Sequence, residues 1–149
     1  MSDIAITLSV DLWQKICSGD KPFEVRKQVP ACFNYNRDRV YVILKGYKDV
    51  VGYFKIDFFA RNQDPHKIWE NHADKIGVKQ DWWWKWVGNS QYVQVWMISR
   101  VRHFDIYEPM ETFLGLEYSP QSYVYVERPI EEPKGKFCDL LKITVHALP

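Results

Sequence analysis

The chain has 149 residues, of which 46% are hydrophobic and 16% aromatic, and its net charge at pH 7 is +1. This content of large apolar side chains excludes a disordered protein, and the length predicts a single domain over residues 1–149. The near-neutral charge excludes a generally basic protein, so a nucleic-acid site has to be a local patch.

Helical periodicity begins after Ser9, whose side chain can cap a helix. Apolar side chains recur at helical spacing over residues 10–18, and Gly19 can adopt the left-handed conformation that ends a helix. We therefore predict a helix over residues 10–18.

Strand patterns come next. Residues 23–26 alternate apolar and charged side chains, which predicts a half-buried strand with Glu24 and Arg26 together on a charged face. Residues 40–44 and 50–59 are rich in β-branched and aromatic side chains and predict a hairpin.

The middle of the chain predicts two more helical segments. Asp64 followed by Pro65 is a helix start signal, and Gly77 ends the same apolar periodicity. Residues 81–86 predict a short helix or turn, and residues 92–102 a long strand.

Two further strands are predicted at residues 123–127 and 140–147, separated by a Pro-, Glu- and Lys-rich loop over residues 128–136. Five or six strands with inserted helices, without strict β-α-β alternation, favour an α+β fold. We expect a small, mixed, strongly curved sheet or barrel.

Three segments in chain order form a recognisable pattern. They are the run from Leu8 through Gly19 to Lys21-Pro22-Phe23-Glu24-Val25-Arg26-Lys27, the strand pair ending at residues 50–54 with the helical insert that contains Trp69, and the Ser-Pro-Gln-Ser-Tyr-Val-Tyr-Val run at residues 119–126. Together they resemble the ASCH family of the PUA-like superfamily. The resemblance implies a PUA-like small mixed β-barrel with inserted helices and a cleft near the first helix. It also implies binding of RNA or of a modified nucleoside.

The string at residues 21–27 supplies the first candidate binding residues, Lys21, Glu24, Arg26 and Lys27. Arg26 can fork to a phosphate or a base edge, Lys21 can hold a phosphate, and Glu24 can accept from an amino group such as that of cytosine. The alternative is that Glu24 and Arg26 pair with each other on a solvated face.

The run at residues 119–126 supplies two more candidates. The amide of Gln121 both donates and accepts, which suits a base edge, and Tyr123 can stack on a base. The alternative is a turn in which Gln121 and Ser122 satisfy local backbone groups.

The tryptophan-rich segment at residues 82–86 supplies a further candidate binding residue. Three consecutive indoles cannot all face the core, so at least one, predicted to be Trp84, lies at the surface or lines a cleft. There it would stack on a base or contact a protein partner, which makes a protein-interaction module a further hypothesis.

An enzyme of the same fold is the alternative to a binding domain. ASCH-like amidohydrolases that act on acetylated cytidine use a lysine, a threonine and a glutamate. The resemblance implies Lys21 as that lysine, Glu24 in place of the threonine, and Asp74 as the nearby carboxylate. A carboxylate in place of the hydroxyl changes the chemistry, so an amidohydrolase on an acylated nucleoside or a ribonuclease ranks second.

No metal or cofactor is predicted, because the four histidines are scattered and no glycine-rich phosphate loop is present. The three cysteines, an odd number and widely spaced, predict reduced thiols. Without a signal sequence or an apolar stretch of roughly 20 residues, the sequence predicts a cytoplasmic protein without a membrane partner, and leaves the oligomeric state open.

Overall fold

The computed structural model describes residues 2–35 and 37–138. Within them, seven strands form one mixed sheet in the order β2-β5-β4-β3-β1-β6, with β7 paired to β5. The elements are β1 (Ile4–Leu8), α1 (Val10–Ser18), β2 (Phe23–Arg26), β3 (Val40–Leu44), β4 (Asp49–Gln63), α2 (Pro65–Ile76), α3 (Gln80–Val87), β5 (Val93–Pro109), α4 (Met110–Leu114), β6 (Tyr123–Tyr125) and β7 (Gly135–Phe137). This arrangement confirms the α+β prediction.

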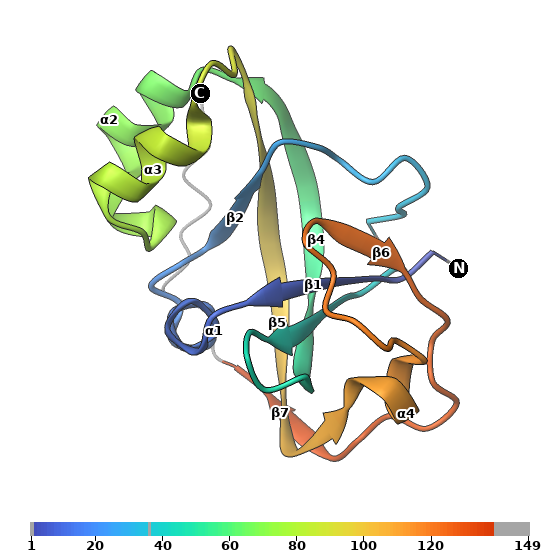
Figure 1. Cartoon of the computed structure of the whole chain (residues 1–149). Coiled ribbons are helices and arrows are strands. Elements are labelled where there is room, and N and C mark those ends of the chain that lie inside the picture. Colours follow the sequence, from blue (N-terminus) through green and yellow to red (C-terminus); the bar gives the residue numbers. More distant parts are fainter. Residues whose placement is uncertain (1, 36, 139–149) are drawn as a thin grey trace.

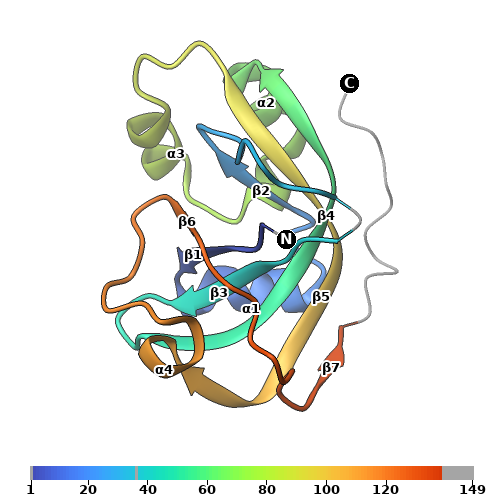
Figure 2. The same ribbon diagram turned by 90° about the vertical axis from the view of Figure 1, so that its right-hand side faces the viewer.

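The sheet is curled into half a barrel because its two long central strands bend. β4 and β5 pair antiparallel along most of their length, and their register shifts at four places. Each such irregularity adds local bend and twist to a strand pair. Figure 2 shows the resulting bow, and Figure 1 shows α2 and α3 at one end of the long strands with α4 at the other.

β1 lies between two partners from distant parts of the chain. It pairs parallel with β3, where Ile4 faces Val40, and antiparallel with β6, where Ile4 faces Tyr125. β1 was not predicted, because the strand is buried on both faces and its apolar run has no alternation.

The predicted helices at residues 10–18 and 65–76 are confirmed, with their caps. The Ser9 side chain accepts from the backbone N–H of Leu12 at 3.2 Å, and the Asp64 side chain accepts from that of His66 at 2.9 Å. Gly77 has a φ of 87°, the left-handed conformation that closes α2.

Four details differ from the sequence predictions. β2 is buried on both faces instead of half-buried, since Phe23 and Val25 pack against α2 and α3 while Glu24, on the other face, pairs with Lys21 and Arg26. The strand predicted at residues 92–102 continues to Pro109, the loop at 128–136 leads into β7, and α4 was not predicted. The strand predicted at residues 140–147 lies outside the described residues.

The core falls into three clusters that fix the helices on the sheet. One joins α1 to β1, β3 and β4, a second joins α2 and α3 to β2 and β5, and a third seats α4. The first two place α1 and the α2–α3 pair next to each other beside β2. In the described part of the chain, no helix is both long and apolar enough to cross a bilayer.

Replacing Gly52 in β4 with alanine should destabilise the fold strongly. A Cβ there would lie 2.1 Å from the carbonyl oxygen of Arg102 and 2.9 Å from Cζ2 of Trp13, and the first contact is to backbone that is held in the sheet. We expect a loss of about 3 kcal/mol or more in the free energy of unfolding, measured by urea denaturation.

Gly46→Ala is the matched control for this change. A Cβ at Gly46 meets nothing within 4 Å, so only the left-handed φ of 86° opposes it, at a cost of about 1 kcal/mol. Equal losses in the two variants would contradict the steric explanation.

Candidate functional site

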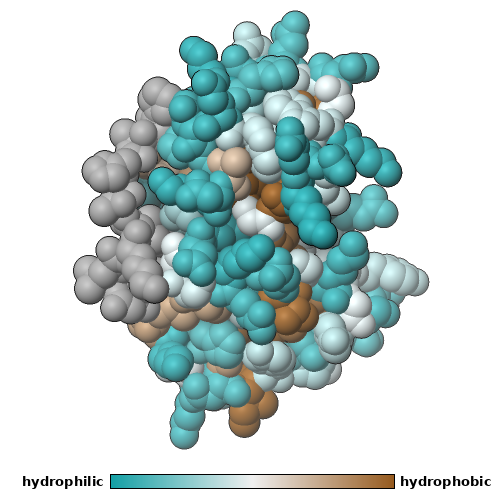
Figure 3. Space-filling model, turned by 90° about the vertical axis from the view of Figure 1, so that its left-hand side faces the viewer, coloured by the Kyte–Doolittle hydropathy of each residue, from teal (hydrophilic) through white to brown (hydrophobic). Residues whose placement is uncertain are grey.

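A cleft of about 730 Å³ opens where α1, β2, the α2–α3 connection and the segment before β6 meet. Seen from the side of the helices, hydrophobic side chains gather in a central band between hydrophilic ones (Figure 3). The residues that line the cleft and carry the following argument are Asp11, Lys21, Glu24, Arg26, Lys45, Lys79, Trp82, Trp83, Trp86 and Gln121.

Lys21 lies at the floor of the cleft and is 2% exposed. Its backbone N–H donates to the carbonyl of Lys15 at 2.9 Å, in the turn that Gly19 permits after α1. Its Nζ donates to the carbonyl of Ile76 at 2.6 Å and pairs with Oε1 of Glu24 at 3.3 Å. Lys21 therefore ties the end of α2 to β2.

Glu24 is buried between Lys21 and Arg26 and uses both of its oxygens. Oε1 faces Lys21 and accepts from the N–H of Val25 at 3.2 Å, while Oε2 accepts from Nε and Nη2 of Arg26 at 3.3 and 3.1 Å. A carboxylate has about four acceptor positions, so Glu24 has none left for a ligand. Glu24 and Arg26 thus pair with each other, as the alternative prediction stated. The pair is largely buried, however, and does not lie on a solvated face.

Arg26 connects the two edges of the half barrel. Its Nη1 donates to the carbonyl of Ser122 at 3.3 Å and its Nη2 to that of Thr7 at 3.5 Å. Among the described residues, no ladder joins the edge strands β2 and β6. The Arg26 side chain bridges them instead, and so positions the segment at residues 119–122.

Burial and charge act in opposite directions on this group. Burial lowers the pKa of Lys21, and the charge of Glu24 only partly offsets that effect. Burial alone would raise the pKa of Glu24, but the charges of Lys21 and Arg26 outweigh it and hold that pKa below its ordinary value. Glu24 is therefore ionised at neutral pH.

Trp82 and Trp86 form one side of the cleft mouth. Their rings stack at 6.0 Å with an interplanar angle of 11°, and Trp82 is 53% exposed. The prediction that Trp84 is the surface indole is wrong: Trp84 is half-buried, 4.6 Å from the ring of His66. Residues 82 and 86 share a helix face, whereas 84 points about 200° away from 82.

The remaining candidates divide between the cleft and other places. Gln121 lines the cleft, and within the described part of the chain its side chain has no hydrogen bond. Lys27 is exposed with its Nζ 5.3 Å from the centre of the Trp86 ring. Tyr123 packs against the core and the ring of Tyr125, and exposed Asp74 is not among the lining residues.

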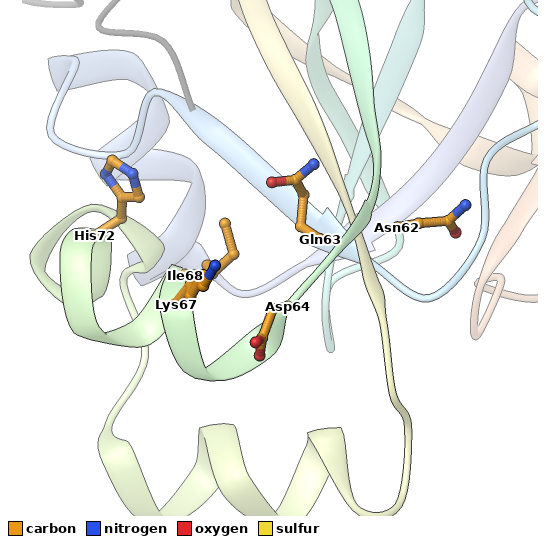
Figure 4. A pocket seen from close by; sticks show the side chains of 6 residues that line it. All are labelled: Asn62, Gln63, Asp64, Lys67, Ile68 and His72. Atoms are coloured by element: carbon orange, nitrogen blue, oxygen red, sulfur yellow. The ribbon is translucent and has the colours of Figure 1, made fainter. Parts of the chain in front are cut away.

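A second pocket of about 300 Å³ lies at the junction of β4 and α2. Figure 4 shows that Asn62 and Asp64 point away from His72, so its polar groups do not converge. His72 is 9% exposed, and neither ring nitrogen has a partner among the described residues. No group of three His, Cys, Asp or Glu side chains suited to a metal ion occurs in residues 2–35 and 37–138.

The comparison with solved structures identifies the fold. The ASCH protein of Zymomonas mobilis superposes with a TM-score of 0.66 at 15% identity, over 84% of this chain and 87% of that one. A serine-to-alanine mutant of it gives 0.68 at 13% identity, over 84% and 88%, and a tyrosine-to-phenylalanine mutant gives 0.66 at 15%, over 85% and 91%. No protein-family model and no curated protein matches the sequence. The chain therefore shares its fold with the ASCH protein of Zymomonas mobilis, as the resemblance in its sequence implied.

Glu24→Gln tests whether the buried charges depend on their shared carboxylate. The variant leaves the buried Lys21 and the partly exposed Arg26 without a counter-charge, and we expect a loss of about 3 kcal/mol in the free energy of unfolding at neutral pH. The stabilisation by Glu24 is complete above its ordinary pKa of 4.5 and is lost as the pH falls through the lowered pKa of the folded state. The variant should therefore lose less stability than the parent on acidification.

Urea unfolding at neutral pH and at about pH 3.5 measures both effects. Asp20→Asn, at an exposed carboxylate in the turn before Lys21, is the control and should change the stability by less than about 0.5 kcal/mol. An acid sensitivity that is the same in the Glu24 variant and the parent would rule out the proposed linkage.

Proposed function

We propose that the cleft binds a single nucleobase, as a modified nucleoside or as one base of an RNA. The observation that carries the proposal is that an exposed indole, Trp82, and an unpartnered amide, Gln121, line the same cleft. An indole offers a flat face for stacking, and an amide can donate to and accept from a base edge.

The size and charge of the cleft support a nucleoside or nucleotide. Its volume of about 730 Å³ lies within the roughly 300–1,000 Å³ that is usual for small-molecule sites. Four of its lining side chains are cationic and two are anionic, although the whole chain is nearly neutral. Lys45 and Lys79 are exposed and have no ion pair in the described residues, so both can meet a phosphate.

The role of the buried charges is to hold the cleft open in one shape. Since Glu24 has no acceptor position left, the reading of an amino group falls to Gln121 instead. Lys21 keeps one N–H beyond its contacts with Ile76 and Glu24, which a ligand oxygen in the cleft could accept.

A hydrolase is the second candidate, and one observation favours it. Lys21 is buried in the cleft and its pKa is lowered, which brings its amine closer to the neutral form that catalysis by lysine needs. Against it, Asp74 does not line the cleft and Glu24 is saturated, so neither is placed as a free base for a water molecule.

Gln121→Ala should weaken nucleoside binding while leaving the fold intact. Isothermal titration with cytidine, acetylated cytidine and the other ribonucleosides measures the affinity, and mass spectrometry of the recovered ligand shows whether it was cleaved. We expect an unchanged ligand and a loss in the variant of about fivefold, the worth of one neutral hydrogen bond.

Gln80→Ala, at an exposed glutamine of α3 outside the cleft lining, is the matched control and should bind as the parent does. Absence of binding for every nucleoside would refute the proposed function. A cleaved ligand, with turnover lost in Lys21→Ala, would establish the hydrolase instead.

A further inference from the structure

The stacked rings of Trp82 and Trp86 extend the cleft onto the outer surface, and we call this pair the indole ledge. Both residues line the cleft, and Trp82 also shows 53% of its surface to solvent. Trp86 is covered by Trp82, by Trp83 at 5.5 Å and by Lys27 at 5.3 Å. Trp82 therefore presents the accessible indole face, next to whatever occupies the cleft.

One lysine contacts the indole ledge and two more lie close to it in the sequence. Lys27 lies against Trp86, Lys79 immediately precedes α3, and Lys85 adjoins Trp86 in the sequence of the helix. Lys79 and Lys85 have no ion pair in the described residues, and Asp81 is the one carboxylate of α3. A flat aromatic face bordered by free ammonium groups is complementary to a base with its phosphates.

We propose that the indole ledge stacks the base adjacent to the one in the cleft, so that the ligand is a single-stranded nucleic acid and not a free nucleoside. This inference rests on the proposed function, because the cleft has to hold the first base. Stacking on an aromatic side chain is worth about 1–3 kcal/mol per base and tolerates any sequence.

The surroundings of Trp82 favour a nucleic acid over a protein partner. Lysine is depleted at the centre of protein interfaces, whereas Lys27 contacts the indole ledge and both Lys79 and Lys85 lie three residues from Trp82 in the sequence. A single-stranded nucleic acid also explains why the exposed indole of Trp82 adjoins the cleft instead of standing alone on the surface.

The test compares ligands of increasing length on the intact chain. Titrations use the four ribonucleosides, the four RNA homotrinucleotides and the matching DNA trinucleotides, at about 50 and about 200 mM salt. We expect at least one trinucleotide to bind about tenfold more tightly than its nucleoside, the equivalent of one stacked base. Tighter binding of RNA than of DNA would identify the ribose hydroxyl as a contact, and equal binding would identify the shared base and phosphate chemistry.

Variants test whether the tighter binding of trinucleotides comes from the indole ledge. Trp82→Ala should reduce trinucleotide affinity to about that of the nucleoside, and Trp82→Phe should retain most of the gain. Lys85→Ala should leave nucleoside affinity unchanged and lower the slope of log affinity against log salt by about 0.7. Lys67→Ala, at an exposed lysine of α2 away from the cleft, should change neither.

The outcomes separate the two claims. Nucleoside binding without any gain for trinucleotides overturns this inference and leaves the proposed function standing. Trinucleotide binding that depends on Trp82 but is unaffected by Gln121→Ala would refute the cleft as the site of the first base, and this inference would fall with it. Dimers that Trp82→Ala dissolves, together with no gain for trinucleotides, would assign the indole ledge to a protein contact and overturn the inference.

Discussion

The carboxylate of Glu24, buried between the cations of Lys21 and Arg26, is the interaction on which the cleft depends. Through Lys21 it reaches the last turn of α2, at the carbonyl of Ile76, and through Arg26 it reaches Thr7 and Ser122. Burying charges is costly unless every charge is paired and hydrogen-bonded. Here both oxygens of Glu24 are occupied, so one four-residue strand holds the helical insert and the opposite sheet edge together.

Because all acceptor positions of Glu24 are filled, this residue supports the structure of the cleft but cannot bind a ligand. A carboxylate whose acceptor positions are all filled can orient its neighbours, but it cannot accept a further hydrogen bond from a ligand. In the proposed function, recognition therefore falls to cleft-lining side chains whose hydrogen-bonding or stacking groups are free. These are the amide of Gln121, the face of Trp82, and the ammonium groups of Lys45 and Lys79. Lys21, Glu24 and Arg26 form the floor of the cleft, and Arg26 holds Ser122, the neighbour of Gln121.

Local signals in the sequence predicted the elements well, and tertiary burial explains where they did not. The caps at Ser9 and Asp64 marked both longer helices, because capping is a contact within a few residues. β1 and the buried face of β2 depend on distant partners, which no local pattern contains. At the site, the spacing of Lys21, Glu24 and Arg26 together with the family resemblance predicted that these residues meet at a cleft, but neither indicated that all acceptor positions of Glu24 are filled. Trp82 and not Trp84 is exposed because α2 covers the side of α3 that carries Trp84. The run of tryptophans in the sequence could not indicate which side that is.

The pairing of β1 with both β3 and β6 also constrains how the chain acquires its shape during synthesis. β1 can meet β3 early, but its other edge, with Ile4 and Ile6, has no partner until residues 123–125 have left the ribosome. An apolar strand with an open edge invites pairing with other chains, and contacts between distant residues form slowly. The same late segment brings Ser122 to Arg26 and Gln121 to the cleft. A nascent chain would therefore be both most prone to aggregation and unable to bind a ligand until nearly all of the described sequence has emerged.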